Sequence, residues 1–279
     1  MKVLILGASG IVGTHMRLCV PDEVEPVWVR RTADSITRGC DLTDYAALVQ
    51  LLRDVYPDVV VNLAGESSVD EVERNPAKYE GINVGLPAVL ADWSRHNKKR
   101  LIQTSSQAVF SGKQPPYSAI EIDFPVNAYG HQKARAEKAV LGARQQVMRL
   151  TFILGIRPMP NVGRQNPLEA MISGQSPQVS DRFFSPLMAW DAAEQIWQEV
   201  VNPSEEPLIQ VGIPERWSRY AIAKLINPSV EWCHHEDFPG IAPRPVDTTY
   251  TGSRWNGQSL AEGIAEAIRR APERTAKLK

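Results

Sequence analysis

The sequence has few cysteines, no long apolar run and no excess of charge of either sign. Its three cysteines, Cys19, Cys40 and Cys233, are odd in number and widely spaced, which excludes a disulfide framework or a zinc-ligand pattern. No apolar run approaches the roughly 18 residues that a membrane span requires, and the N-terminal run is too short for a signal segment. We therefore expect a cytoplasmic protein with reduced thiols and no membrane contact.

The charge balance also bears on the class of partner. The chain has 31 basic and 32 acidic residues, a formal net charge of −1, and no long block of one sign. Such a surface offers nothing specific to nucleic acid. With 279 residues and 43% hydrophobic content, the chain can bury a full core. We expect a globular protein that binds a small molecule; its oligomeric state stays open, with a homodimer as one option.

A short apolar strand predicted over residues 3–6 leads into three regularly spaced glycines. The spacing is Gly7-x-x-Gly10-x-x-Gly13, and a helix-like segment follows. Buried strand, glycine turn and helix form the order of a dinucleotide site, where the glycines let the backbone approach a pyrophosphate. A purely structural turn is the alternative. The residues assigned to cofactor binding here are Gly7, Ser9, Gly10, Ile11, Val12 and Gly13.

The second predicted strand, residues 25–29, is followed directly by Arg30 and Arg31. At this strand end an acid pairs with the ribose 2′-hydroxyl of NAD, whereas an arginine accommodates the 2′-phosphate of NADP. Two arginines and no acid favour NADP(H) over NAD(H), the alternative being a solvated basic loop. Further on, Asp41 and Leu42 are assigned to the adenine region, and Thr43 or Asp44 could cap a helix over residues 45–55.

Two more apolar strands are predicted, over residues 58–65 and 100–104, and both end in small or polar residues. Ligands bind at the carboxyl ends of parallel strands, so these residues are expected to line the cofactor crevice. The cofactor residues assigned here are Asn62, Leu63, Ala64, Gly65 and Thr104. The substrate-binding residues assigned to the adjoining loops are Glu66, Ser67, Ser105, Ser106 and Gln107. A helix cap is the alternative role for either serine.

Tyr129 and Lys133 stand four residues apart in a segment predicted to continue as a helix to residue 141. This spacing places both side chains on one helix face. A cation near a phenol favours the phenolate, so we expect the pair to exchange a proton closer to neutral pH. The spacing alone is common, but Ser106 and the glycine turn are expected at the same sheet edge. We therefore predict proton transfer to a carbonyl.

Taken in order, these motifs resemble the extended short-chain dehydrogenase/reductase family over about the first 155 residues. The motifs are Gly7-x-x-Gly10-x-x-Gly13, Asp41-Leu42, Asn62-Leu63-Ala64-Gly65, Thr104-Ser105-Ser106, Tyr129-x-x-x-Lys133 and Arg149-Leu150. Within the family, the segments around residues 57–62, 109–112 and 125–130 look most like the dTDP-4-dehydrorhamnose reductase branch of sugar-nucleotide reductases. The resemblance implies an α/β fold, namely a Rossmann-like doubly wound parallel sheet that binds NAD(P).

The resemblance also implies roles for three side chains. Tyr129 would be the acid/base, Lys133 would hold the nicotinamide ribose and lower the tyrosine pKa, and Ser106 would bond the reacting oxygen. Related 4,6-dehydratases carry an Asp-Glu pair after the hydroxyl residue, where this chain has Gln107 and Ala108, so dehydration is not expected. The reductases usually have Asp-Tyr there, and the resemblance therefore does not identify the sugar.

The composition changes after residue 155. Thirteen of the 21 prolines and five of the seven tryptophans follow Arg157, which predicts a loop-rich region. We expect a dinucleotide-binding domain over residues 1–155 and a mainly substrate-binding region over 156–279. Segments around residues 185–200 are expected to return to the Rossmann sheet.

Arginines in this second region are candidates to hold a diphosphate, because the planar guanidinium suits phosphate oxygens. The candidates are Arg157, Arg164, Arg182 and Arg244. An ordinary surface arginine is the alternative for each. Arg182 and Arg244 are assigned to substrate binding, the latter because the reductase branch also carries an Arg-Pro near its end. The run of residues 233–237, Cys-His-His-Glu-Asp, is interpreted as a polar loop and not as a metal site.

Three functional hypotheses follow. The first is an NADP(H)-dependent reductase of a keto group on a nucleotide-linked deoxysugar or a related carbonyl. The second is a sugar-nucleotide epimerase that retains its NAD. The third is a non-catalytic, cofactor-binding regulatory subunit of the same fold, against which the intact set of Ser106, Tyr129 and Lys133 argues.

Overall fold

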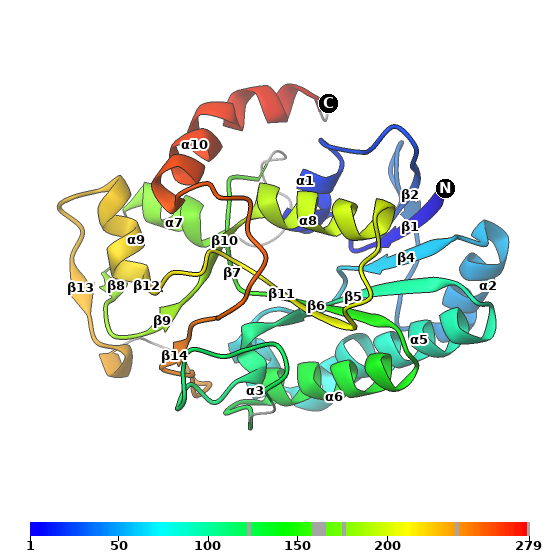
Figure 1. Ribbon diagram of the computed structural model, residues 1–279, viewed down its shortest axis with the longest axis horizontal. Coiled ribbons are helices and arrows are strands. Elements are labelled where there is room, and N and C mark those ends of the chain that lie inside the picture. The colour runs from blue at the N-terminus through cyan, green and yellow to red at the C-terminus, as the bar shows by residue number, and fades with distance from the viewer. Residues whose placement is uncertain (122–123, 158–165, 175–176, 238–239, 278–279) are drawn as a thin grey trace.

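The computed structural model describes the chain except for residues 122–123, 158–165, 175–176, 238–239 and 278–279; for residues 271–277 it describes the backbone alone. A seven-stranded parallel sheet forms the centre of the molecule (Figure 1). Its order is β11-β6-β5-β4-β1-β2-β3. The strands are β1 (Lys2–Leu6), β2 (Glu25–Arg30), β3 (Arg38–Gly39), β4 (Val59–Asn62), β5 (Arg100–Ser106), β6 (Gln146–Leu150) and β11 (Leu208–Val211). The predicted Rossmann-like doubly wound sheet is confirmed.

Helices cover both faces of this sheet, which explains why its strands are almost uniformly apolar. One face packs against α1 (Ile11–Met16) and α8 (Ala189–Val201), and the other against α2 (Tyr45–Val55), α5 (Leu86–His96) and α6 (Ala128–Gly142). On the first face Trp197 lies edge-on to Trp28, with ring centroids 6.1 Å apart, and its indole N–H donates to the Met16 carbonyl at 3.0 Å. Trp197 is thus a core residue.

The helix predicted over residues 45–55 is observed with those bounds. Asp44 is its N-cap and accepts the N–H groups of Ala46 and Ala47, both at 3.1 Å. The alternative cap, Thr43, instead donates its hydroxyl to the Asp41 carboxylate at 2.7 Å. Sequence alone left the two candidates open, and the structure selects Asp44.

A long helical stretch follows α3 (Val69–Arg74) and changes its winding midway. It consists of α4 (Pro76–Glu80), the π-helical turn η1 (Gly81–Gly85) and α5. The buried Asn83 lies in the π turn, accepts the Glu66 N–H at 2.9 Å and donates to the Gln132 side chain at 2.8 Å. Asn83 thus ties the loop of Glu66 to this helical stretch. Such π turns often mark functional sites.

Most of the chain after β6 forms small sheets and helices outside the central sheet (Figure 1). The strands are β7 (Phe152–Leu154), β8 (Gln178–Val179), β9 (Phe183–Phe184), β10 (Pro186–Met188), β12 (Trp217–Ser218), β13 (Trp232–Cys233) and β14 (Asp247–Thr248). The helices are α7 (Pro167–Ser173), α9 (Arg219–Ile226) and α10 (Leu260–Lys277), with the 3-10 turn η3 (His235–Asp237). Another 3-10 turn, η2 (Gln107–Val109), directly follows β5.

The region around residues 185–200 reaches the central sheet through a helix. Strand β10 pairs with β7 outside the seven-stranded sheet, while α8 packs on the sheet face itself. The strand that joins the sheet is β11, paired with β6, and no pattern in the sequence predicted it. The division of the chain at residue 155 stays a prediction.

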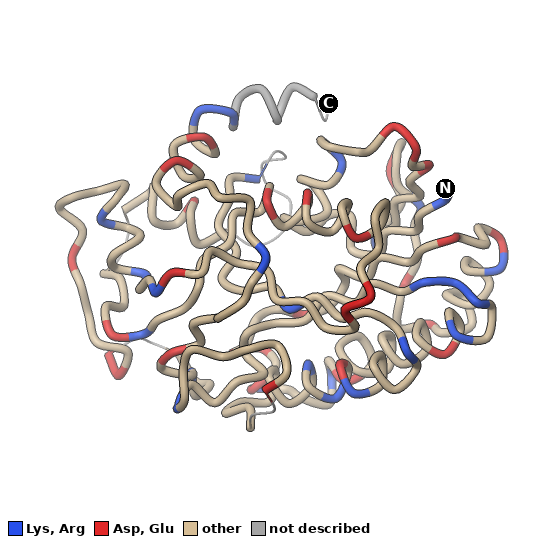
Figure 2. Tube along the Cα trace, in the orientation of Figure 1, with Lys and Arg blue, Asp and Glu red and all other residues tan. Residues whose placement is uncertain are grey.

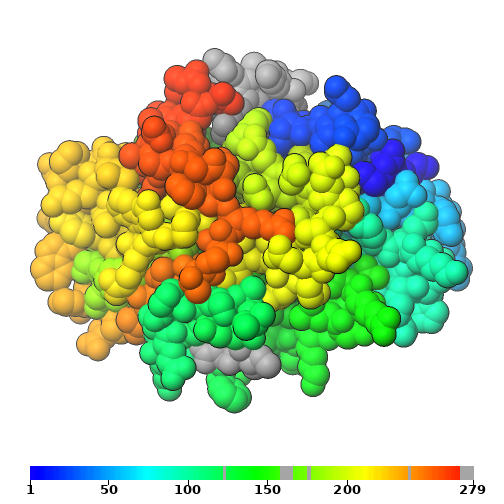
Figure 3. All heavy atoms as spheres, in the orientation of Figure 1, coloured from blue at the N-terminus to red at the C-terminus, as the bar shows by residue number. Residues whose placement is uncertain are grey.

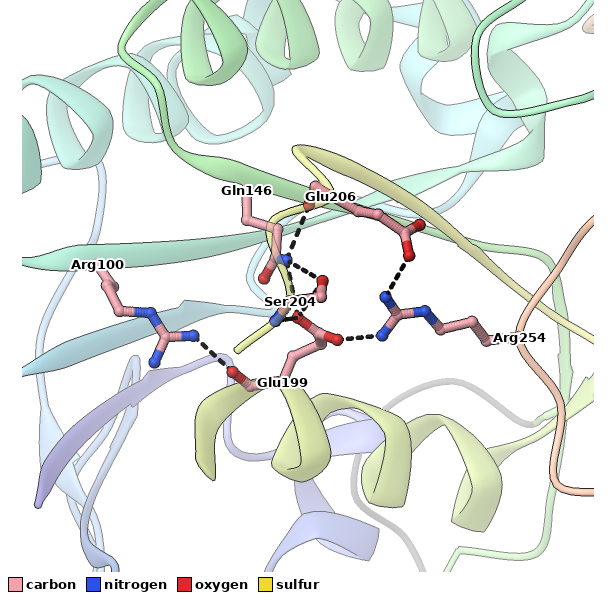
Figure 4. A network of polar contacts seen from close by, with 6 residues as sticks. All are labelled: Arg100, Gln146, Glu199, Ser204, Glu206 and Arg254. Carbon is pink, nitrogen blue, oxygen red and sulfur yellow. Dashed lines mark hydrogen bonds and ion pairs between the residues drawn. The ribbon is translucent and has the colours of Figure 1, made fainter. Parts of the chain in front are cut away.

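Two contacts bind the C-terminal segments to the rest of the molecule. Tyr117 forms a bridge with Tyr250, and the segment after β14, orange in Figure 3, lies against the green segment that contains Tyr117. Arg254 pairs with the buried Glu199 of α8 and, at 2.9 Å, with Glu206 (Figure 4). Gln146 of β6 also donates to Glu199, at 2.8 Å, so one buried carboxylate joins three segments.

Charges of both signs are interspersed along the described chain, as Figure 2 shows. Among the described residues no helix is both long and apolar enough to cross a lipid bilayer.

Candidate functional site

The parallel register brings the carboxyl ends of the central strands to one sheet edge. Leu6 of β1 is level with Val29 of β2 and Asn62 of β4, and Ser106 ends β5 opposite Leu150 of β6. From β1 the chain adds β2 and β3 on one side of the sheet and then β4, β5 and β6 on the other. Doubly wound sheets bind their ligands at such a switch point. The predicted cofactor and catalytic residues therefore meet at one edge.

The glycine turn leaves no room for side chains. Gly7 has φ of +87°, and a Cβ there would lie 2.8 Å from the backbone nitrogen of Ala64. A Cβ on Gly13 would lie 2.8 Å from the Gly7 carbonyl oxygen. Glycine is thus required both for the positive φ and for close backbone packing. A cradle of this kind fits a dinucleotide pyrophosphate, which must approach the backbone closely.

The end of β2 carries more negative charge than the sequence pattern suggested. Arg30 donates to the Asp34 carboxylate at 2.9 Å, and Arg31 is exposed. Hydrogen bonds from Thr43 and the charge of Arg31 lower the pKa of Asp41. The premise of two arginines without an acid is therefore wrong for this loop, because Asp34 reaches back to Arg30 from four residues further along the chain.

The ends of β4 and β5 are joined by their own polar side chains. Asn62 is fully buried; its amide donates to Gln103 at 2.8 Å, and its oxygen accepts the Ala64 N–H at 3.0 Å. The Thr104 hydroxyl donates to the Asn62 carbonyl at 2.8 Å. These bonds fix the turn of residues 63–65 under the glycine turn. Asn62 and Thr104 thus shape the crevice, and their direct contact with a cofactor stays a prediction.

Ser106 and Tyr129 are brought together at this edge. Ser106 ends β5, and a hydrogen bond joins its hydroxyl to the Tyr129 phenol. Burial raises the pKa of Tyr129, the bond with Ser106 lowers it, and the nearby Glu66 carboxylate raises it; the net shift is upward. The expected lowering of this pKa is therefore wrong, because desolvation disfavours the phenolate. The protonated phenol is the form that can donate a proton.

Lys133 lies one turn after Tyr129 on α6, with 7% of its surface exposed. Its ammonium donates to the Thr104 carbonyl oxygen at 2.8 Å. Burial lowers the pKa of Lys133 to about 8, against the opposing charge of Glu137. The amine is thus fixed between α6 and the end of β5. Its predicted contact with a nicotinamide ribose stays a prediction.

The lowered pKa of Lys133 predicts a pH limit on activity. Lys133 is an ammonium below pH about 8 and neutral above it, so its charge, and any rate that depends on it, is lost as the pH rises. We expect kcat/KM for carbonyl reduction to fall above pH about 8, and Lys133→Met to lower the rate and abolish this basic limb. Initial rates over pH 6 to 10, with enzyme stability checked at each pH, measure both. A basic limb of unchanged position in Lys133→Met would assign it to another group.

A buried ion pair lies further along the same helix. Glu137, one turn after Lys133, accepts two bonds from Arg149 of β6, at 2.9 and 2.8 Å. The guanidinium also donates to the Ala119 carbonyl at 3.1 Å and stacks over the Phe110 ring at 4.9 Å. Both charged side chains are more than nine-tenths buried. The pair fixes α6 against the sheet directly behind the lysine.

The start of α6 is fixed from three directions. Asn127 caps the helix by accepting the Gly130 N–H at 2.8 Å, and its amide donates to the Pro243 carbonyl at 2.9 Å. Glu73 of α3 accepts the Ala128 N–H at 2.7 Å. A Cβ on Gly130 would overlap the Ala108 carbonyl, so glycine lets the helix lie close to η2. Tyr129 therefore stands on a rigid turn.

The predicted substrate loop lies over this turn. Asn83 holds the Glu66 backbone, Glu66 accepts the Ser68 N–H at 2.7 Å, and Ser67 is exposed. Gln107 accepts a hydrogen bond from the Thr151 hydroxyl, and the buried Ser105 hydroxyl has no partner within the described chain. Glu66 is near Tyr129, as its effect on the tyrosine pKa indicates. Substrate contact by these residues stays a prediction.

Arg182 and Arg244, the two arginines assigned to substrate binding, lie near each other and near Arg219. Burial and the charges of Arg244 and Arg219 lower the pKa of Arg182 to about 10. Asp70 of α3 binds Arg244 at 2.8 Å and also accepts the N–H groups of Ile241 and Ala242, both at 3.1 Å. We call Arg182, Arg219 and Arg244 the arginine cluster. Gathered like charges of this kind suit an anionic ligand.

Arg219 was missed because only the fold brings α9 beside the segment of Arg244. Its position directly after Ser218 indicates a helix start and nothing about a ligand. Glu137 and Asp34 were missed for a similar reason, since nothing in the sequence identifies their arginine partners. The motif Arg149-Leu150 pointed to Arg149, but nothing in it identified Glu137 as the partner.

Other predicted residues lie elsewhere. Arg157 is paired with Glu169 at 3.2 Å, and Arg164 falls outside the described residues. Asp181 binds His235 at 2.9 Å and His234 at 3.3 Å. Within the described chain, no group of three or more His, Cys, Asp or Glu side chains could hold a metal ion.

A cavity of about 390 Å³ opens between α1, α8 and α10. Trp190 and Asp191 line it, so Trp190 is a cavity wall. Burial and the nearby charge of Glu194 raise the pKa of Asp191 to about 6, although the hydrogen bond from Asn256 acts in the opposite direction. None of Ser106, Tyr129 and Lys133 lines this cavity.

Residues 1–266 match the model of a known protein family, described as RmlD substrate binding domain. The rat methionine adenosyltransferase 2 subunit beta is 35% identical over 145 residues, which cover 50% of this chain but only 42% of that protein. The chain thus spans less than half the length of that relative.

Two other relatives are similar over nearly the whole chain. A probable dTDP-4,6-dihydroxy-2-methyloxan-3-one 4-ketoreductase of Streptomyces antibioticus is 27% identical over 272 residues, covering 94% of this chain and 90% of that one. The structure of a dTDP-4-dehydrorhamnose reductase from Bacillus anthracis in complex with NADP superposes with a TM-score of 0.84 at 20% identity, covering 96% and 99%. At this identity the structural match shows a shared fold.

Proposed function

Because the chain belongs to the RmlD substrate binding domain family, we propose that it is an NADP(H)-dependent reductase of a keto group on a nucleotide-linked deoxysugar. The observation that carries this proposal is the set of Ser106, Tyr129 and Lys133 at the carboxyl edge of the sheet. The full-length similarity to a dTDP-sugar ketoreductase supports the substrate class. The NADP held by the Bacillus anthracis neighbour supports the cofactor.

The residues give each part of the reaction a place. The nicotinamide cofactor, when bound over the glycine turn, supplies the hydride for the carbonyl carbon. Ser106 bonds the carbonyl oxygen, and Tyr129 donates the proton that this oxygen takes up as the alcohol forms. Lys133 is placed to bind the nicotinamide ribose and to stabilise the phenolate that remains. The product is the hydroxyl sugar.

The arginine cluster supplies the binding energy for the nucleotide part. Arg182, Arg219 and Arg244 are partly buried and gathered on the side of α3 and the start of α6. We propose that they bind the diphosphate, since charge-assisted bonds to phosphate are among the strongest available. Asn127 ties the segment of Arg244 to the helix that carries Tyr129, and Asp70 ties the same segment to α3. Binding and chemistry are thus held in one frame.

The test is consumption of NADPH. The purified protein is mixed with NADPH and a panel of 4-keto sugar nucleotides, and the fall in absorbance of the cofactor is followed together with the mass of the product. Stoichiometric reduction of one member supports the proposal. No turnover with any keto sugar or simple carbonyl, at cofactor concentrations that saturate binding, would overturn it.

A second candidate is a cofactor-binding subunit of another enzyme. The observation that favours it is the 35% identity to a methionine adenosyltransferase subunit. In that case Tyr129→Phe would leave function unchanged, whereas the reductase requires the phenol.

An epimerase would consume no NADPH and would retain its NAD through purification.

A further inference from the structure

We propose that Asp34 determines how strongly this protein prefers NADP to NAD, by competing with the ribose 2′-phosphate for Arg30. The inference rests on the proposed function, since it concerns the cofactor of that reaction. It gives a role in cofactor specificity to Asp34, a carboxylate four residues after Arg30.

The position of Arg30 follows from the glycine turn. The N–H groups of Gly7 and Ala8 both donate to the Val29 carbonyl, at 3.1 and 3.0 Å. Arg30 is the next residue and the last of β2. It therefore lies beside the turn that would carry the pyrophosphate, at the strand end that meets the adenosine ribose in this fold.

Asp34 is built into this position. One carboxylate oxygen accepts Arg30 Nη1 at 2.9 Å, and the other accepts the N–H groups of Ile36 and Thr37 at 2.9 and 2.7 Å. The hydrogen bond from the Ile36 N–H has the largest effect, and together these bonds hold the pKa of Asp34 well below its usual range. The carboxylate is therefore charged at any working pH. It is also one-third exposed, so it can meet a ligand.

The neighbouring charges leave Arg31 as the more available cation. Arg31 is exposed and has no ion pair within the described chain, although it lies close enough to Asp41 to lower the pKa of that carboxyl. Arg38 of β3 is also exposed, and Asp44 is occupied as the cap of α2. Of the two strand-end arginines, only Arg30 carries a fixed carboxylate.

The two cofactors meet this arrangement differently. A 2′-phosphate brings nearly two negative charges beside Asp34, and it must share Arg30 or displace the carboxylate from it. A 2′-hydroxyl can donate to Asp34 without any such repulsion. Asp34 therefore narrows the preference for NADP that two arginines alone would give.

The decisive variant is Asp34→Asn. Asparagine keeps a side-chain oxygen for the N–H groups of Ile36 and Thr37, so the loop is preserved while the charge is removed. We expect the Kd of NADP⁺, measured by calorimetry without any sugar, to fall about tenfold or more, and that of NAD⁺ to stay within about threefold or to rise. Asp54→Asn on α2 is the matched control, since Asp54 also bonds a neighbouring side chain, at 2.7 Å, far from this loop in sequence. In Asp54→Asn the ratio of the Kd of NADP⁺ to the Kd of NAD⁺ should equal that of the wild type.

A double-mutant cycle separates competition from loop damage. Arg30→Ala should weaken NADP⁺ binding only slightly in the wild type, where Arg30 is held by Asp34, but about tenfold or more in Asp34→Asn. An unchanged ratio of affinities in Asp34→Asn, or weaker NADP⁺ binding, would overturn the inference and show that Asp34 positions Arg30 for the phosphate. A wild type that binds neither dinucleotide would overturn the proposed function as well, so the two failures are distinguishable.

Discussion

Replacement of Tyr129 by phenylalanine is expected to lower kcat by about 10²- to 10⁴-fold, the range that a positioned general acid contributes. The Tyr129 phenol is bonded to Ser106 and its pKa is raised, so it is protonated and is our proposed proton source for the keto oxygen. Phenylalanine keeps the ring and its packing. Binding of NADP⁺ should therefore stay within about threefold of the wild type, and single-turnover consumption of NADPH measures the chemical step.

The chain offers a matched control in Tyr250→Phe. Tyr250 is 2% exposed, and its hydroxyl has no partner within the described chain. Burial raises its pKa, and Tyr129 and Glu137 add to the shift. Removing a buried hydroxyl without a partner costs nothing in hydrogen bonding, so activity should be retained and stability equal or higher. Retention of more than a tenth of the activity in Tyr129→Phe would exclude Tyr129 as the acid.

Replacement of Arg149 by methionine is expected to lower the free energy of unfolding by about 3–5 kcal/mol, because it leaves the buried carboxylate of Glu137 without its partner. The bidentate bonds at 2.9 and 2.8 Å and the contact with the Phe110 ring are lost together. Urea unfolding followed by fluorescence and circular dichroism measures the change.

The double variant Glu137→Met with Arg149→Met is the control for this prediction. Replacing both charges by apolar side chains of similar length removes the desolvation cost together with the pair. We expect its stability to recover to within about 1 kcal/mol of the wild type. If Arg149→Met alone costs less than about 1 kcal/mol, water must reach Glu137, and the pair does not fix α6.

Patterns local in sequence predicted most of the central fold. Apolar runs and the glycine turn predicted strands β1, β2, β4 and β5, and the family resemblance implied the Rossmann-like sheet that contains them. Asp44, as one of two candidate caps, marked the start of α2. Each of these signals depends on neighbours within a few residues.

What escaped prediction depends on pairs distant in the chain. Strand β11 is short and ordinary in composition, and only its place beside β6 makes it part of the sheet. Glu137 finds Arg149 twelve residues later, and Arg219 joins Arg244 from another helix. Asp34 is only four residues after Arg30, but the geometry of the turn between them decides whether the two side chains bond. The roles of the catalytic set themselves stay predictions until the enzyme is assayed.

The pairing of β11 with β6 limits how this protein can be divided. A fragment that ended near residue 155 would leave β6 as an open edge strand, with unpaired N–H and C=O groups that recruit other chains. It would also uncover Trp28 of β2 and Met16 of α1, which α8 covers. We expect such a half-molecule to aggregate, although it would contain the glycine turn and Ser106, Tyr129 and Lys133. The first part of the sheet is therefore completed by chain that follows it, and a genetic fusion or split of this protein should keep residues 189–211 with the first 155 residues.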